Sequence, residues 1–453
     1  MSRIDPQTEA HRFFTLATQS WQGGRLEDAE RGFAQAAILL PEWAAAHANL
    51  GAVLRRQGKP EAAVSCYRRS LALEPNQAGI LSNLGNALRD LGRLPEARTA
   101  HRRAVELAPD NIGFIYNLAL LLRDLRRMDE AATLLERLAA AQPANADFEW
   151  DLALTRLYQG DYKRGFAGYE ARLRLARNPA RPFPGERWTG DDIAGRTILL
   201  TSEQGFGDAL QFARYVPLLA ARGAAIVLEC LPELAELFAG LAPDIALVAK
   251  DAPAPPYDVW APMASLPHLV GTTFDTIPAA TPYLTAPPRP ELNMPRSPST
   301  LLTMGLVWAG KTTPRDRSWP LEELTPLLED PRVAAYSLQL GPRAADLARL
   351  GVNRLVIDAA PVLTSFADTA AVMRRLDLIV TIDTSAAHLA GALGRPVWVL
   401  LRHISDWRWQ DEPATSPWYP TMRLFRQPDP FDFKTPIAEL AQALRQMVAA
   451  RQC

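Results

Sequence analysis

Three short loops of this chain combine residue types that could do chemistry. The first, Asp383-Thr384-Ser385, follows the apolar run Leu378–Ile382 and precedes the helix-forming run Ala386–Leu393, which Gly394 ends. This order predicts a buried parallel strand, a tight loop and a helix. Backbone N–H groups at a helix N-terminus attract anions, so the loop is suited to a phosphate group. A second interpretation stays open, in which Asp383 or Thr384 only caps the helix.

A second loop, Thr201 to Gln211, follows another apolar run and contains Gly205, Gly207 and Asp208. The glycines allow a sharp turn and a close approach of a ligand to the backbone. Asp208 could be a general base that takes a proton from an attacking hydroxyl. It could equally be the N-cap of the helix that begins there.

The third loop, Trp308 to Leu321, carries the cations Lys311, Arg315 and Arg317 within seven residues. Such a cluster beside a helix N-terminus is suited to a diphosphate leaving group. The alternative is an exposed, solvated loop without a ligand.

Alternating apolar runs and amphipathic segments predict the elements that position these loops. The pattern is typical of parallel, doubly wound sheets with ligands at the carboxyl ends of the strands. We expect a linker at 178–195, an acceptor-binding Rossmann-like half at 196–285 and a nucleotide-binding Rossmann-like half at 300–453. The expected strands are 197–201, 225–230, 245–249, 258–261, 304–308, 335–339, 354–357, 378–382 and 397–401, and the expected helices include 208–222, 234–241 and 436–450.

The first third of the chain repeats with a period of 34 residues. The columns are Pro41, Pro75, Pro109 and Pro143; Ala29, Ala63, Ala97 and Ala131; Leu16, Leu50, Leu84 and Leu118; Ala17, Gly51, Gly85 and Ala119; and Phe33, Tyr67, His101 and Leu135. This register resembles the tetratricopeptide repeat, whose helix pairs stack into a solenoid with a concave groove. We expect an α-solenoid over 8–177, with four full repeats and a capping repeat that docks on the next domain.

Asn49, Asn83 and Asn117 also lie 34 residues apart, on the first helix of successive repeats. One interpretation is an amide ladder that binds the backbone of an acceptor peptide in the groove. The other is that these residues cap local turns or face water. For the array as a whole, partner binding and a passive spacer both stay open.

Composition excludes several classes of protein. The 453 residues have a formal net charge of −1, which argues against nucleic acid as a partner. The three cysteines, Cys66, Cys230 and Cys453, have no metal-binding or redox spacing, as expected for a cytoplasmic protein. The start lacks the apolar core of a signal peptide, and no apolar run approaches the roughly 20 residues of a membrane helix.

Together the three loops resemble those of GT-B glycosyltransferases related to bacterial heptosyltransferases (glycosyltransferase family nine). The resemblance covers roughly 196–453 and rests on Gly207-Asp208, Arg317-Ser318-Trp319-Pro320 and Asp383-Thr384-Ser385-Ala386-Ala387-His388-Leu389. It implies that Asp208 is the catalytic base, that Arg317 contacts the donor phosphates, and that the amides of Thr384, Ser385 and Ala386 hold the diphosphate. Arg317 stands where the family usually has Lys, and Ser385 where it has Gly.

Other donor-binding candidates are Gly207, Lys311, Asp383, His388 and, at the nucleotide base, Gln339. His388 either contacts the donor or braces the loop. No Asp-x-Asp metal motif is evident, so we expect neither a metal nor a cofactor beyond the nucleotide-sugar.

The fusion to repeats resembles bacterial protein glycosyltransferases with tetratricopeptide repeats, including those that modify flagellin, and is similar in layout to O-GlcNAc transferase. The segment Asp406-Trp-Arg-Trp409 fits this group, with Trp407 and Trp409 either at the donor site or in the core. The resemblance implies an inverting, metal-independent transfer to a Ser or Thr hydroxyl of a protein. The alternatives are a repeat scaffold with a non-catalytic domain and a heptosyltransferase-like enzyme that acts on a saccharide.

Overall fold

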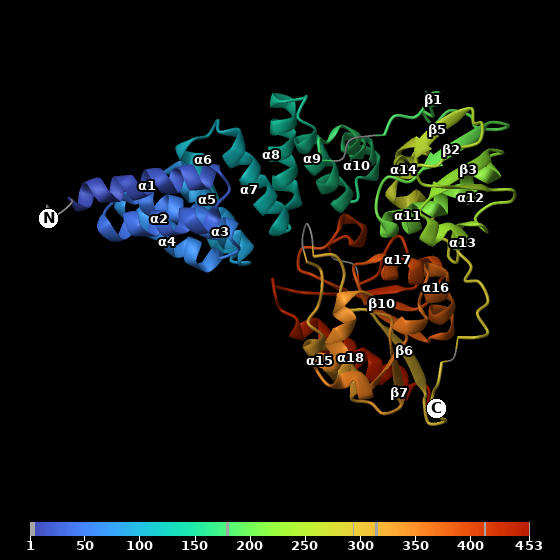
Figure 1. Cartoon of the computed structure of the whole chain (residues 1–453). Helices are drawn as coiled ribbons and strands as arrows, with labels where there is room; N and C mark the ends of the chain where they lie inside the picture. The colour runs from blue at the N-terminus through green and yellow to red at the C-terminus, as the bar shows by residue number, and fades with distance from the viewer. Residues whose placement is uncertain (1–4, 178–180, 293, 313–315, 412–413, 453) are drawn as a thin grey trace. The chain divides into compact units, whose positions relative to one another are not determined.

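The structure is a computed structural model that describes residues 5–177, 181–292, 294–312, 316–411 and 414–452 (Figure 1). The chain divides into two compact units, Met1–Thr155 and Arg156–Cys453, which we call the repeat unit and the sheet unit. Arg315 and Cys453, which the sequence analysis named, lie outside the described residues.

The repeat unit consists of helices joined by short turns, and neighbouring helices contact one another. They are α1 (Pro6–Gln22), α2 (Leu26–Leu39), α3 (Ala44–Arg56), α4 (Pro60–Leu73), α5 (Ala78–Asp90), α6 (Leu94–Leu107), α7 (Ile112–Asp124), α8 (Met128–Ala141) and the first part of α9 (Ala146–Tyr158). The expected helical repeat array is confirmed.

The periodic small residues let helices of one repeat approach closely. A Cβ atom on Gly51 would lie 2.8 Å from the ring of Tyr67, and one on Gly85 would lie 2.6 Å from the ring of His101. The glycine leaves room for the ring, so that Tyr67 and His101 are both buried against the neighbouring helix. Size complementarity along two columns therefore fixes the helix pairs.

The first sheet of the sheet unit has five parallel strands in the order β1-β5-β2-β3-β4. Their bounds are β1 (Glu186–Arg187), β2 (Thr197–Thr201), β3 (Ala225–Cys230), β4 (Ala246–Ala249) and β5 (Val259–Pro262). Strand β1 lies inside the linker expected at 178–195, so that part of the segment belongs to the sheet. The proposed domain boundaries otherwise stay predictions.

Several helices connect these strands. They are α11 (Phe206–Phe212), α12 (Val216–Ala221), α13 (Ala235–Phe238) and α14 (Leu266–Leu269). The single helix expected at 208–222 was wrong, because a 3-10 turn at Ala213–Tyr215 separates α11 from α12. Pro217 explains the break: it has no N–H to continue α11 and is favoured near the start of a new helix.

The second sheet has six parallel strands in the order β11-β10-β9-β6-β7-β8. They are β6 (Leu302–Leu306), β7 (Val333–Ser337), β8 (Val356–Asp358), β9 (Leu378–Ile382), β10 (Val397–Leu401) and β11 (Met422–Arg426). Strand β11 was not expected. The chain winds outward in both directions from the β6–β9 pair, so the loops after these strands meet at the topological switch point, where open α/β sheets bind ligands.

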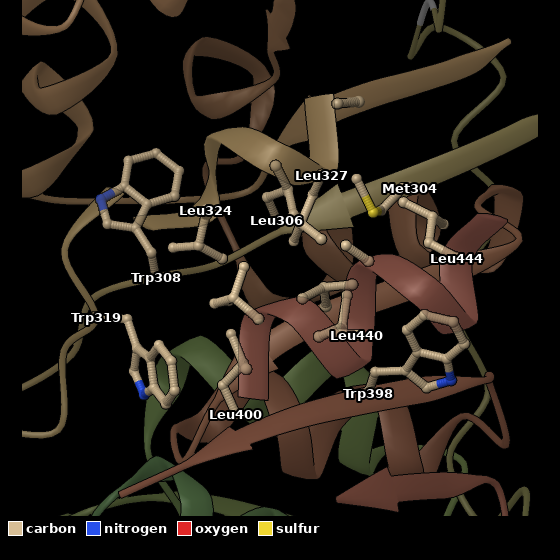
Figure 2. Close-up of a cluster of buried hydrophobic side chains, with 14 of the residues drawn as sticks. Met304, Leu306, Trp308, Trp319, Leu324, Leu327, Trp398, Leu400, Leu440 and Leu444 are labelled. Carbon is tan, nitrogen blue, oxygen red and sulfur yellow. The ribbon is translucent and has the colours of Figure 1, made fainter. Parts of the chain in front are cut away.

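A large apolar core supports this second sheet (Figure 2). Met304 and Leu306 of β6 pack with Leu440 and Leu444 of α18 (Lys434–Ala449), and all four are at most 3% exposed. Burying each such side chain contributes about 1.5–3 kcal/mol. The core thereby fixes β6, from which the loop with Lys311 and Arg317 starts.

Helix α10 (Tyr162–Tyr169) and the 3-10 turn Glu170–Arg174 belong to the sheet unit. We call residues 162–174 the cap. The rings of Tyr162 and Phe166 lie 5.7 and 6.3 Å from that of Trp418. The second helix of the drifted fifth repeat is thus part of the sheet unit and packs within it.

Candidate active site

A cleft of about 740 Å³ lies where the loops after β2, β6 and β9 meet. Its walls include Gly205–Asp208 from the first half and Val307, Ala309–Lys311 and Arg317 from the second. Asp383–Ala386 and His388 complete that side. The structure therefore brings the three loops singled out by sequence to one cleft.

Asp208 lies in the first turn of α11, and Gly205 is the residue in the N-cap position. The interpretation of Asp208 as an N-cap was therefore wrong. Its side chain is 29% exposed, and Oδ1 accepts a hydrogen bond of 2.6 Å from Nη2 of Arg408. Arg408 therefore holds one oxygen of the Asp208 carboxylate, and the carboxylate lines the cleft.

The surroundings of Asp208 act on its ionisation in opposite directions. The protein around the carboxyl removes water from it and so raises its pKa, and the nearby Asp406 adds to this rise. The cation of Arg408 and the N–H of Gly205 oppose it. For Arg408, burial would lower the pKa, but Asp406 and Asp208 outweigh burial and hold it well above the usual range.

The loop after β6 folds back on its own strand. The N–H of Trp319 donates to the carbonyl of Trp308 at 2.8 Å, and the N–H of Gly310 donates to Oγ of Ser318 at 3.2 Å. Lys311 is exposed at the cleft, while Arg317 is 41% exposed and pairs with Asp383 at 3.0 Å. The two described cations of the predicted cluster thus reach the cleft.

The loop after β9 leads into helix α17 (Ser385–Ala392), which ends before Gly394 at a φ of 65°. Thr384 occupies the N-cap position, but no side chain caps the helix, and the Asp383 carboxylate binds Arg317 instead. The side-chain cap interpretation was therefore wrong. Thr384, Ser385 and Ala386 are half-buried and line the cleft, so the helix N-terminus faces it.

Burial raises the pKa of Asp383, and Arg317 opposes the rise. For Arg317 itself, burial would lower the pKa, but Asp383 outweighs it and the pKa is raised. The guanidinium thus remains a cation at the helix N-terminus.

His388 braces the contact between the two halves. Its Nδ1 lies 2.9 Å from the hydroxyl of Tyr419, and its ring stacks on Trp409 at 5.4 Å. Its Cδ2 would lie 3.0 Å from a Cβ atom on Gly207. Burial and the nearby cations hold the pKa of His388 well below its usual range, so the ring is neutral at pH 7.

Gln339 lines the cleft but is only 5% exposed. Its Oε1 accepts hydrogen bonds from the N–H groups of Trp308 and Ala309 at 3.0 and 2.8 Å, and its Nε2 donates to the carbonyl of Leu340 at 2.9 Å. The side chain ties β7 to the loop after β6. Its proposed contact with a nucleotide base stays a prediction.

The three asparagines lie in the repeat unit and are half-buried. Nδ2 of Asn49 donates to the carbonyl of Ala45, and Nδ2 of Asn117 donates to Oγ of Ser82 in the preceding repeat. The first hydrogen bond lies within one helix and the second joins two neighbouring repeats, so both stabilise the repeat array. A groove role for Asn49, Asn83 and Asn117 stays a prediction.

Sequence reasoning overlooked Arg408, which contacts Asp208 directly. It emphasised Trp407 and Trp409 of the same segment, yet both are buried and neither lines the cleft. The sequence did contain a signal: Arg408 stands between two tryptophans that are expected to be buried. A buried cation needs anionic partners, so an acidic residue near Arg408 could have been predicted. In the parts of the chain that the structure describes, no group of three His, Cys, Asp or Glu is placed to hold a metal ion, and no helix is long and apolar enough to cross a membrane.

Parts of both units match family models. Residues 49–112 and 88–157 match models of the tetratricopeptide repeat, and residues 315–429 match the model of glycosyltransferase family 9 (heptosyltransferase). The last match contains Arg317, Asp383 to His388 and Arg408.

A curated relative is Protein FlbA of Caulobacter vibrioides, which is 27% identical over 316 residues. The match covers 63% of this chain and 53% of FlbA, so the chain spans about half the length of this relative.

Solved structures of repeat proteins are also similar to this chain. One is pilF of Pseudomonas aeruginosa, at 22% identity, with 38% of this chain and 78% of that chain covered and a TM-score of 0.34. Another is MamA of Desulfovibrio magneticus RS-1, at 17% identity, with coverages of 38% and 98% and a TM-score of 0.36. TM-scores this low carry no argument about function. The family matches are sufficient to say that the chain joins tetratricopeptide repeats to a glycosyltransferase domain related to heptosyltransferases.

Proposed function

We propose that this protein transfers a sugar from a nucleotide-sugar to a Ser or Thr hydroxyl of an acceptor protein, with inversion at the anomeric carbon and without a metal ion. The observation that carries the proposal is the cleft itself. It places the Asp208 carboxylate of one half together with a helix N-terminus and two cations of the other half. The family 9 match supports the same reaction class.

In this mechanism Asp208 takes the proton of the acceptor hydroxyl. The acceptor oxygen then forms a bond to the anomeric carbon while the bond from that carbon to the diphosphate oxygen breaks, and a nucleoside diphosphate leaves. One displacement inverts the configuration. The N–H groups of Thr384–Ala386 with Lys311 and Arg317 offset the charge that develops on the diphosphate.

The repeats recruit the acceptor in this proposal, since stacked repeats form extended binding surfaces. A flagellin-like protein in the bacterial cytoplasm is the candidate acceptor. The heptosyltransferase relationship favours a saccharide acceptor instead. Incubation with flagellin and with deacylated lipopolysaccharide, read by intact mass, decides between the two.

Asp208→Asn tests the base assignment. It keeps the shape of the side chain but removes the proton acceptor, so turnover should fall by about 10²–10⁴-fold while donor still binds. Turnover is measured by product formation, and donor binding by calorimetry. The matched control is Asp275→Asn, an exposed residue of the same unit that does not line the cleft. Turnover retained in Asp208→Asn sinks the assignment.

A donor panel separates the enzyme from a scaffold with an inactive domain. A ligand that binds the folded state raises the stability by about 2.7 kcal/mol at 100 times its Kd. At least one nucleotide-sugar should therefore raise Tm. If none does, the scaffold is favoured.

A further inference from the structure

The segment Asp406–Gln410 of the second half reaches the proposed base in the first half. Arg408, at its centre, is 7% exposed and donates from Nη2 to Oδ1 of Asp208 at 2.6 Å. Its Nη1 donates to Oδ1 of Asp406 at 2.9 Å, and its Nε donates to Oε1 of Gln211. All three nitrogens of the guanidinium therefore have partners, and its orientation is determined.

Aromatic rings enclose the same guanidinium. Its central carbon lies 4.5 Å from the ring centre of Trp407 and 5.6 Å from that of Phe212. Cation–π contacts add to the hydrogen bonds where water is excluded. Arg408 is thus a rigid group that spans from one half to the other.

The residues next to Arg408 are anchored in the cap. The ring of Trp407 lies 5.6 Å from that of Phe166 and 6.3 Å from that of Tyr169. Nε2 of Gln410 donates to the hydroxyl of Tyr162 at 3.2 Å. The cap therefore contacts the segment on both sides of Arg408.

The cap also holds the loop that precedes Asp208. Arg172, which is 1% exposed, donates from Nε to Oε1 of Glu203 at 2.9 Å, and the hydroxyl of Tyr169 lies 3.3 Å from the side-chain oxygen of Gln204. Both partners of the Asp208–Arg408 pair are consequently tied to the same element.

We propose that Arg408 is a positioning residue that holds the Asp208 carboxylate in its reactive orientation, and that the cap fixes Arg408 through Trp407. The inference rests on the proposed function of Asp208 as the base. Arg408 holds Oδ1, and in this proposal the other oxygen, Oδ2, takes the acceptor proton. Its positive charge favours the ionised form of Asp208, which is the form that accepts a proton.

Other charged and titratable groups also surround Asp208. Asp406 comes from the same segment as Arg408, and Arg317 comes from the loop after β6. Tyr169 approaches from the cap, and His388 of α17 packs on the adjacent Gly207. Only Arg408 donates a hydrogen bond to the Asp208 carboxylate from another part of the described chain.

Arg408→Gln and Arg408→Lys test the inference through the pH dependence of kcat/KM. Loss of the cation in Arg408→Gln raises the pKa of Asp208, so the low-pH limb of the kcat/KM profile should move to higher pH by about one unit. Loss of the fixed carboxylate orientation should in addition lower the plateau of kcat/KM by about tenfold or more. Arg408→Lys keeps the charge and should return the limb toward that of the wild type. Donor affinity should stay unchanged, so the loss appears in kcat.

Arg445→Gln is the matched control, since it makes the same charge change at an exposed position on α18. Arg445→Gln should leave the low-pH limb of the kcat/KM profile unchanged. An unmoved limb in Arg408→Gln overturns the role of Arg408. So does a limb in Arg408→Lys that moves as far as in Arg408→Gln.

Trp407→Leu tests the part played by the cap. Removing the ring loosens Arg408 without changing any charge, so the limb should shift in the same direction by less than in Arg408→Gln. An unmoved limb overturns the cap's role. These failures are distinct from those of the proposed function: the base assignment fails if Asp208→Asn retains turnover, and the enzyme itself is disfavoured if no nucleotide-sugar raises Tm.

Discussion

The two units of this protein handle charge in different ways. In the repeat unit, many ion pairs, such as Arg55–Asp90 and Lys59–Glu30, lie on the surface with side chains 30–50% exposed, and the more buried pair Arg89–Asp124 joins neighbouring repeats. In the sheet unit, Arg172, Arg214 and Arg408 are each at most 7% exposed and each makes several hydrogen bonds. The repeat unit is built from neighbouring apolar contacts, and the sheet unit also depends on buried cations that join distant segments.

The buried arginines of the sheet unit lie near the candidate active site, whereas the exposed ion pairs belong to the repeats. Burying a cation is costly unless partners compensate it, so such groups are retained where a fixed orientation is needed. Arg408 and Arg172 lie beside the proposed base and its loop. The surface pairs of the repeats can vary without loss of fold, which suits a binding surface that adapts to its partner.

The largest expected effect breaks the buried network. Arg172→Met leaves Glu203 without its partner and should lower the free energy of unfolding by about 3–5 kcal/mol. The matched change Arg55→Met in the repeat unit removes an exposed pair and should cost at most about 1 kcal/mol. Denaturant unfolding followed by tryptophan fluorescence and circular dichroism measures both. Equal costs would remove the contrast between the units.

A smaller effect tests the close packing of the repeats. Gly85→Ala places a Cβ atom 2.6 Å from the His101 ring and should destabilise the protein by about 1–3 kcal/mol. Gly79→Ala, in the same helix but with open space around it, should stabilise by up to about 1 kcal/mol, because Ala favours helix. The two Tm values should move in opposite directions. A loss of stability in both would show that helix propensity does not govern the open position.

The smallest effect concerns His101, the buried histidine in the column formed by Phe33, Tyr67, His101 and Leu135. Burial, with Arg89 and Arg55 nearby, lowers the pKa of His101 to about 4. Since the unfolded chain binds a proton near pH 6.5 and the folded chain does not, stability is lost as pH falls from 6.5 toward 4. At pH 5.5 the loss is about 1.2 kcal/mol relative to pH 7. His101→Leu, which copies Leu135 of the next repeat, should remove this part of the pH dependence in denaturant titrations at the two pH values.

Much of the fold could be predicted because periodicity and strand patterns are local signals. The 34-residue columns predicted the repeats, and the bounds of β2, β3, β9 and β10 agree with the expected ones. Strand β1 has only two residues, and β11 carries Arg423 and Arg426 among its apolar residues, so neither resembles a buried strand in sequence. The helix break at Pro217 was readable but was missed.

The candidate site was predictable only as separate loops. Each loop follows its own strand, and the parallel topology brings them to one cleft. The Asp208–Arg408 pair joins residues 200 positions apart, and nothing in the local sequence of either indicates the other. Likewise, three hydrogen bonds of Gln339 to backbone groups of Trp308 and Ala309 depend on tertiary structure.

The contact between Gly207 and His388 has a consequence for the range of substrates. It limits how far α11 and α17 can separate or shift, because even a methyl group on residue 207 would meet the ring at 3.0 Å. A fixed separation between these two helices holds the reacting groups in place whichever sugar is bound, so it does not by itself select among sugars. Under the proposed function we therefore expect donor preference to depend on the other walls of the cleft, near Leu338–Leu340 and Leu363–Phe366, and substitutions there should change which sugar is transferred.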